Sequence, residues 1–265
     1  AILGQTHCSL ESLLEVQSRK SQFSYARLAF PCMLMLCTEW LAIITSSYIY
    51  GRGSEEAIRG GERLNPIMVA TLVSLWGVSY SLANATNVLI GNTICAGDIP
   101  LAKHYLKIAG FTFIGVALVV VISLTSVWTS VLRMSNIKFV VGDVDQARTT
   151  FVIFTFGTYL LNALQCWLQG VISGLGLQVE ACIYPMLVHM GLSFPLMAFL
   201  VKQRGMGMIG IQVGLSMGYL LICLFFAIII TSHDWDRLSK KIRKDLTAVK
   251  TPRHSQGLNN RHSPV

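Results

Sequence analysis

Long stretches without charged residues set the strongest limit on how this chain can fold. The stretches cover residues 28–50, 64–97, 149–179, 181–201 and 205–233, and Glu39 is the one charged residue among them. Each is long enough to cross the hydrocarbon core of a bilayer as a helix, which needs about 20 apolar residues. Charged residues make up 13% of the chain, roughly half the usual share in a soluble protein. The sequence therefore predicts an all-α integral membrane protein.

Six transmembrane helices are expected, because a further apolar stretch at residues 106–130 contains only Lys107, close to its edge. An even number of crossings puts both termini on one side of the membrane, and 13 of the 21 Lys and Arg residues fall on that side. This excess of positive charge favours cytoplasmic termini. The expected spans are about 28–50, 67–90, 106–130, 150–172, 181–201 and 208–231.

The chain divides into three parts. Residues 1–27 are expected to form a cytoplasmic segment, in which Leu10, Leu13 and Leu14 recur at helical spacing and predict a short amphipathic helix at the membrane interface. Residues 28–232 form the six-helix bundle. Residues 233–265 form a basic cytoplasmic tail, and its polar end from residue 251 onward is expected to be disordered.

The net charge of +8 does not indicate a nucleic-acid partner. The tail that starts at His233 carries +5 of this charge, and a basic segment after a last span is typical of contact with anionic membrane lipid. The seven cysteines are scattered and include no C-x-x-C pair. The sequence therefore predicts neither a disulfide framework nor a metal site.

Gly205, Gly207 and Gly210 have the G-x-G-x-x-G spacing of dinucleotide sites. Such a site also needs a preceding strand and an acidic residue about 20 residues later. Here one apolar stretch ends and the next begins, and no acid occurs before Asp234. A flexible turn between two spans explains the glycines better, and no cofactor is expected.

A second glycine pattern leaves an alternative open. Ser216 lies in a G-x-S-x-G motif, and together with His189 it would suit an intramembrane serine hydrolase. The same glycines also occur as Gly210-x-x-x-Gly214-x-x-x-Gly218, a stripe of small residues through which membrane helices pack closely. Packing is the favoured interpretation, and the chain is not expected to be an enzyme.

Glu39 is the strongest functional candidate. It falls near the middle of the first expected span, where an ionised carboxylate costs several kcal/mol unless it is protonated or has a partner. Acids inside membrane spans are rare and usually line a pathway for ions or substrates. Pro31, eight residues earlier, can free helix carbonyls for a cation or a water.

Several short motifs, in order along residues 28–237, resemble the second half of the multidrug and toxic compound extrusion (MATE) transporters. Pro31 followed by Glu39 and Trp40 resembles the seventh span of that family. The segment from Gly91-Asn92 to Gly97 resembles the segment after the eighth span. A third stretch resembles the tenth span of the family and its exit, and it contains Asn162, Gly174, Gly176 and Gln178. Asp234-Trp235 fits the eukaryotic branch.

The resemblance implies a fold and a function. MATE transporters have twelve spans in two six-helix lobes, and this chain matches the second lobe. Members export organic cations or other drugs in exchange for protons or sodium, across the plasma membrane or an intracellular membrane such as the vacuolar one. The resemblance implies ion coupling at Glu39, with polar contacts from Asn162, Asn84 and Asn87. It also implies a first six-helix lobe as partner, within a longer chain or separate.

The chain departs from the family at four positions. Asn162 stands where the tenth span commonly has an acid, and Ile44 stands where some eukaryotic members carry a second acid in the seventh span. Leu89 and Ser173 replace two arginines. An asparagine can coordinate a cation or hydrogen-bond Glu39, but it cannot release a proton. A second hypothesis is therefore a diverged or truncated lobe without transport activity of its own.

Overall fold

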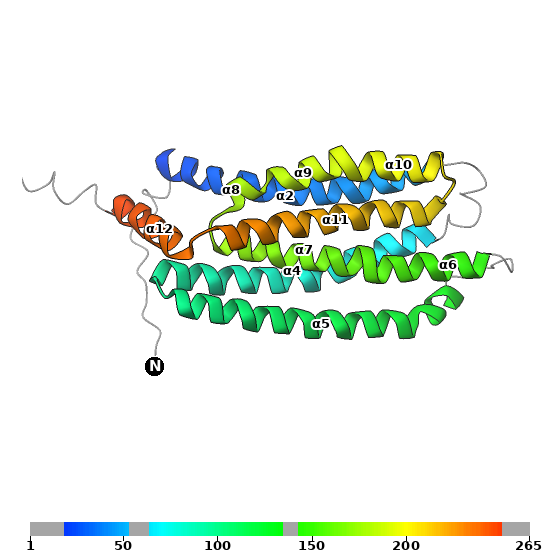
Figure 1. Cartoon of the computed structure of the whole chain (residues 1–265), viewed down its shortest axis with the longest axis horizontal. Helices are drawn as coiled ribbons and strands as arrows, with labels where there is room; N and C mark the ends of the chain where they lie inside the picture. Colours follow the sequence, from blue (N-terminus) through cyan, green and yellow to red (C-terminus); the bar gives the residue numbers. More distant parts are fainter. Residues whose placement is uncertain (1–18, 53–63, 135–142, 251–265) are drawn as a thin grey trace, which may run out of the picture.

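The computed structural model describes residues 19–52, 64–134 and 143–250, and every regular element in these ranges is a helix (Figure 1). Six segments are long and apolar enough to cross a membrane, and each overlaps the span expected from the sequence. The all-α, six-span architecture is thus confirmed. The segments are Tyr25–Gly51, Pro66–Ala96, Ile99–Trp128, Arg148–Gly174, Gln178–Lys202 and Gly207–Ser232.

The first span belongs to a longer helix than the sequence predicted. Helix α2 runs over Arg19–Gly51, so residues 19–27 belong to the same helix as the first span. The helix also continues through Pro31, which removes one backbone donor and leaves a carbonyl of the preceding turn without its usual partner. The amphipathic segment expected around Leu10 to Leu14 lies outside the described residues.

Helices α4 (Leu64–Ala96) and α5 (Ile99–Met134) form the second and third spans and are joined by a tight turn. Gly97 adopts a left-handed conformation with φ of 86°, which glycine reaches without a steric penalty. The Asp98 carboxylate then accepts a hydrogen bond of 3.0 Å from the Leu101 amide and caps the start of α5. The local sequence thus reverses the chain within two residues.

The fourth and fifth spans each contain a π-helix, which the sequence did not predict. The fourth consists of α6 (Asp143–Val152), the π-helix η1 (Ile153–Tyr159) and α7 (Leu160–Gly174). The fifth consists of α8 (Gln178–Ala181), α9 (Ile183–Val188), the π-helix η2 (His189–Ser193) and α10 (Phe194–Lys202). A π-helix bonds each amide to the carbonyl five residues back, so its wider turn changes which side chains face inward.

The sixth span, α11 (Gly207–Ser232), is followed by a further helix, α12 (Trp235–Lys250), within the segment predicted as a basic tail. Figure 1 shows α12 lying obliquely at the end of the bundle, near the α4–α5 turn. The Trp235 indole donates to the carbonyl of Ile230 (3.2 Å), and the Ser239 hydroxyl donates to the carbonyl of Ile94 (2.7 Å). Helix α12 therefore adds hydrogen bonds to carbonyls in the last turns of α11 and α4, where the donors of the helix itself run out.

Glycines let the helices approach closely at two interfaces. A side chain at Gly170 on α7 would collide with the backbone of Ala83 on α4. On α11, Gly214 lies against Met197 of α10, and Gly218 lies against Ser193 of η2. The predicted packing role of the glycine stripe on α11 is thus confirmed.

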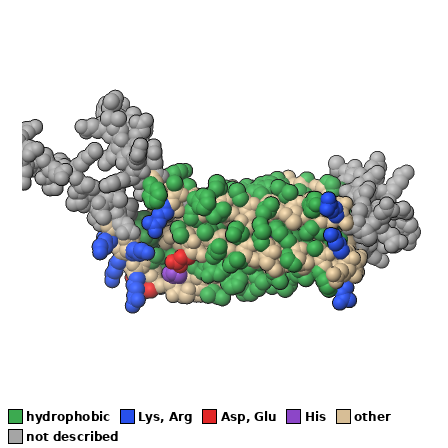
Figure 2. Space-filling model, turned by 90° about the horizontal axis from the view of Figure 1, so that it is seen from above, with side chains coloured by type: hydrophobic (Ala, Val, Ile, Leu, Met, Phe, Trp, Pro, Cys, Tyr) green, Lys and Arg blue, Asp and Glu red, His purple; other side chains and the backbone are tan. Residues whose placement is uncertain are grey.

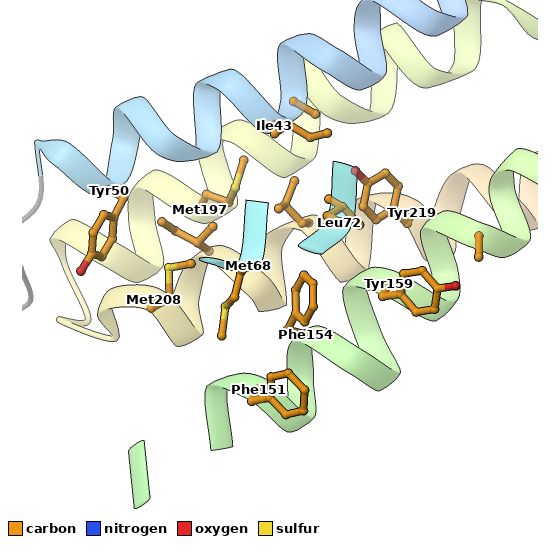
Figure 3. Packing of buried hydrophobic residues seen from close by; sticks show 14 of the residues in the cluster. Ile43, Tyr50, Met68, Leu72, Phe151, Phe154, Tyr159, Met197, Met208 and Tyr219 are labelled. Carbon is orange, nitrogen blue, oxygen red and sulfur yellow. The ribbon is translucent and has the colours of Figure 1, made fainter. Parts of the chain in front are cut away.

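The buried side chains form two apolar clusters. One lies around Met68, Phe151, Phe154 and Met208 and is shown in part in Figure 3. The other lies nearer α12 and includes Ile94, Ile172, Phe226 and Trp235. The face of the bundle drawn in Figure 2 is also largely apolar along its middle, with Lys and Arg near its two ends. Such a surface fits a protein surrounded by lipid rather than water.

Candidate ion-binding site

Glu39 lies inside the bundle and is only 2% exposed. Its Oε1 accepts a hydrogen bond of 2.5 Å from the Asn162 amide nitrogen, and the Cys166 thiol lies 3.7 Å from the same oxygen. Asn162 and Cys166 are four residues apart on α7, so they stand one turn apart on the same helix face. Two membrane helices, α2 and α7, therefore meet at a single buried carboxyl group.

The surroundings of Glu39 explain how this group is tolerated. Thr38, the preceding residue on α2, donates its hydroxyl hydrogen to the carbonyl of Leu34 at 2.7 Å, one turn back on its own helix. The Asn162 amide is the principal hydrogen-bond donor that another helix supplies to Glu39, and the Trp76 side chain of α4 also interacts with the carboxyl group. A carboxyl group in this setting can hold a proton, or it can bind a small cation together with the amide oxygen of Asn162.

Three aromatic side chains lie close to Glu39. Trp40 on α2 meets Trp76 on α4 edge-on, with ring centroids 5.9 Å apart, and Trp76 stacks on Tyr80 at 4.6 Å. Trp40 and Tyr80 are partly exposed, at 36% and 40%. The three rings form an aromatic row between the surface of the bundle and the region of Glu39. Aromatic faces of this kind attract organic cations.

The other predicted polar contacts are placed differently. Asn84 is exposed on α4 and Asn87 is half-buried on the same helix. No hydrogen bond within residues 19–52, 64–134 and 143–250 joins either of them to Glu39. The structure therefore brings Glu39 and Asn162 together and leaves Asn84 on the outside of the bundle.

The predicted motif residues serve mainly in packing and turns. Gly91 on α4 and Gly174 on α7 face each other, and a Cβ atom at Gly174 would lie 2.9 Å from the carbonyl of Asn87. Gly97 and Gly176 are the left-handed residues of two turns, with φ of 86° and 73°. Pro31 is buried within α2, whereas Asn92 is exposed near the end of α4.

A second buried polar cluster was not predicted. The Thr158 hydroxyl on η1 donates to the Gln212 side-chain oxygen on α11 at 2.6 Å, and it lies 3.2 Å from the Ser216 hydroxyl. The Gln212 amide in turn points to the Met68 sulfur of α4, at 3.8 Å. Gln212 is an uncommon polar residue within a charge-free stretch, and this could have marked it as a candidate.

The structure does not support the serine hydrolase alternative. The Ser216 hydroxyl donates to the backbone carbonyl of Gln212 at 2.6 Å, one turn back on its own helix. His189 Nδ1 instead lies 3.2 Å from the Ser193 hydroxyl, and its ring meets Tyr219 edge-on. Among the described residues, Ser216 and His189 are not hydrogen-bonded to each other, so the arrangement that would activate the serine is not formed.

Comparisons with known proteins place this geometry in context. The chain is 27% identical over 90% of its length to multidrug and toxin extrusion protein 1 of Danio rerio, and it covers 40% of that protein. It is 28% identical over 83% of its length to Protein DETOXIFICATION 17 of Arabidopsis thaliana, and it covers 45% of that protein. No family model matches the chain.

The fold has a solved counterpart. The crystal structure of the eukaryotic MATE transporter AtDTX14 matches with a TM-score of 0.75 at 17% identity, covering 86% of this chain and 50% of that one. The chain thus spans from two fifths to one half of the length of these three proteins. These relatives are named as extrusion proteins, detoxification proteins or transporters, and not as enzymes, as the sequence predicted. The chain is a multi-pass membrane protein related to the MATE transporters, and its six helices have the fold of one lobe of such a transporter.

Proposed function

We propose that this chain is the second six-helix lobe of a MATE-type antiporter, which exports organic cations or drugs in exchange for protons or sodium. The observation that carries the proposal is the buried contact between Glu39 and Asn162, at 2.5 Å. An acid inside a membrane bundle lowers stability unless it is neutral or partnered, so its presence there favours a role in ion movement.

Coupling would occur by exchange at Glu39. When the carboxyl group holds a proton or sodium ion, its charge is neutralised and the site is compatible with its apolar surroundings. When the ion leaves, the carboxylate is negatively charged again. A new positive charge, which an organic cation supplies, then stabilises it. A transporter that opens alternately to the two sides of the membrane converts this competition into antiport.

The aromatic row provides a binding surface for the substrate near Glu39. Trp40, Trp76 and Tyr80 present ring faces and edges between the surface and Glu39. Cation–π attraction and apolar contact suit the alkyl or aromatic ammonium groups of organic cations. The exposed Asn84 would face the first lobe and add a polar contact there.

A second candidate function is a diverged lobe that does not transport. The presence of Asn162 in place of an acid favours it, because the site then holds one exchangeable proton rather than two. The two candidates differ in one measurable property, which is transport after the chain is combined with a first lobe.

The test is transport in proteoliposomes. The purified chain alone is expected to move no tetraethylammonium when a pH or sodium gradient is applied. The same chain co-expressed and co-purified with the first lobe of a MATE relative is expected to do so. A first lobe with its interface disrupted by introduced charges serves as the matched control. Stable two-lobe complexes that remain inactive in both gradients would refute the antiporter proposal and favour the diverged lobe.

A further inference from the structure

We propose that the bundle contains a second binding site, for an uncharged aromatic small molecule, in an apolar cavity between α4, α5 and the fourth span. The cavity has a volume of about 400 Å³, within the range of small-molecule sites. Its lining does not include Glu39 or Asn162. The lining includes Met68, Thr71, Ser123, Trp128, Phe151 and Phe154.

The inner wall of the cavity is aromatic and buried. Trp128 of α5 and Phe151 of α6 stack with ring centroids 3.7 Å apart, and Phe154 lies next to Phe151 at 6.2 Å. Met68 completes this wall from α4, close to Phe154 (Figure 3). Stacked rings beside a polarizable thioether favour a flat aromatic ligand over a flexible aliphatic chain.

The chemistry of the lining excludes a charged ligand. None of the residues around the cavity carries a charge, so an ion entering it would lose its hydration without gaining a partner. The two hydroxyl groups, of Thr71 and Ser123, already donate to carbonyls of their own helices at 2.7 Å. They can only accept a hydrogen bond from a ligand. This site therefore differs in specificity from the acid site at Glu39.

The cavity can be reached from the side of the bundle. Ser123 and Val127 at its edge are exposed on α5, whereas Met68, Phe151 and Phe154 are buried. The edge lies within the segments Pro66–Ala96 and Ile99–Trp128, which are long enough to span the membrane. A lipophilic molecule dissolved in the bilayer would enter between α4 and α5 without passing through water.

Photolabelling with 3-trifluoromethyl-3-phenyldiazirine, an uncharged aromatic probe, tests the proposal. The purified chain is labelled in detergent and in lipid nanodiscs, and the modified residues are mapped by mass spectrometry. We expect saturable labelling of Trp128, Phe151 or Phe154 in both media. An excess of trifluoromethylbenzene, which has the same shape without the photoreactive group, should abolish it.

A matched pair of variants makes the test specific. Ser123→Phe fills the cavity from its edge and should abolish the saturable labelling. Ser126→Phe should leave it unchanged, because Ser126 is equally exposed on α5, makes the same kind of hydrogen bond to its own helix, and does not line the cavity. If Ser123→Phe does not fold, Thr71→Phe replaces it, with Ser74→Phe as its control.

Three results would overturn the proposal. Labelling that does not saturate would show simple contact with the outer surface. Labelling that persists in a folded Ser123→Phe or Thr71→Phe variant would place the probe elsewhere. Labelling that is present in detergent and absent in nanodiscs would show that a lipid acyl chain, rather than an aromatic molecule, occupies the cavity. None of these results depends on whether the chain takes part in transport.

Discussion

Asn162 determines how Glu39 can exist inside the bundle. Its amide donates to the Glu39 carboxyl group across two helices, and both side chains are almost fully buried. A buried acceptor that loses its donor bears the cost of its lost hydration, about 1–3 kcal/mol and more if it is charged. The pair should therefore affect stability as well as ion binding.

Asn162→Leu is expected to lower the free energy of unfolding by about 1–3 kcal/mol, because Glu39 loses its donor while the volume of the side chain is nearly kept. The measurement is thermal unfolding of the purified chain in detergent. Asn84→Leu, at an exposed position on α4, should change the midpoint little. Equal effects of the two substitutions would show that the contact with Glu39 does not contribute to stability.

The sequence predicted part of this site at the residue scale. Glu39 was identified because it is the one charged residue in an otherwise uncharged stretch. The resemblance identified Asn162 as a possible partner. Cys166 and the contact between Thr158 and Gln212 were missed. The latter two lie 54 residues apart in the sequence, and no local pattern indicates which polar side chains of different spans will meet.

At the scale of elements, α12 is held by the ends of two other helices. Ser239 is 3% exposed and donates to the carbonyl of Ile94, and Trp235 donates to Ile230. Leu238 and Ile242 pack against the same end of the bundle. The basic residues Lys240 and Lys241 are exposed, in a position suited to anionic lipid headgroups.

Ser239→Ala is expected to loosen α12, because the Ile94 carbonyl loses a hydrogen bond worth about 1 kcal/mol. Amide hydrogen exchange within α12 should then become severalfold faster, while exchange in α7 stays unchanged. Lys240→Ala, at the next and exposed position, is the control and should have no such effect. Unchanged exchange in Ser239→Ala would show that apolar packing alone holds the helix.

Close contact between α4 and α7 depends on Gly170. A methyl group there would meet the backbone of Ala83, whereas Gly77 on α4 has no heavy atom within 4 Å of the same position. Gly170→Ala should therefore destabilise the bundle by roughly 1–3 kcal/mol through overpacking. Gly77→Ala should be neutral or slightly stabilising, by up to about 1 kcal/mol. Thermal unfolding of both variants would reveal the difference, and similar midpoints would contradict the close packing.

The six spans were predictable because charge-free stretches of sufficient length have few alternatives in a bilayer. The π-helices η1 and η2 were not, because a single widened turn barely alters the spacing of apolar residues in a helix that is apolar on all sides. The helical state of α12 was missed for another reason. Its high charge was interpreted as a basic cytoplasmic tail without regular structure being assigned, although Trp235, Leu238 and Ile242 lie at helical spacing.

At the scale of the whole molecule, the bundle has the fold of half of the solved MATE chain that it matches. It covers 50% of that chain, and the exposed Trp40 and Tyr80 lie with Trp76 beside the region of Glu39. A first lobe placed against this surface would enclose a pathway in which the acid meets both ion and substrate. Transport by such a complex would require that Glu39 exchanges an ion.

The most direct measurement is efflux of an organic cation driven by a pH or sodium gradient, in proteoliposomes that contain this chain together with a first lobe. Glu39→Gln keeps the size and the hydrogen-bonding capacity of the side chain but removes its exchangeable charge. We therefore expect Glu39→Gln to reduce efflux to background under both gradients while the protein remains folded. Glu180→Gln, at an exposed acid that pairs with His233 at 3.2 Å, should keep its activity. Efflux at the wild-type rate in Glu39→Gln would show that Glu39 does not couple ion movement to transport.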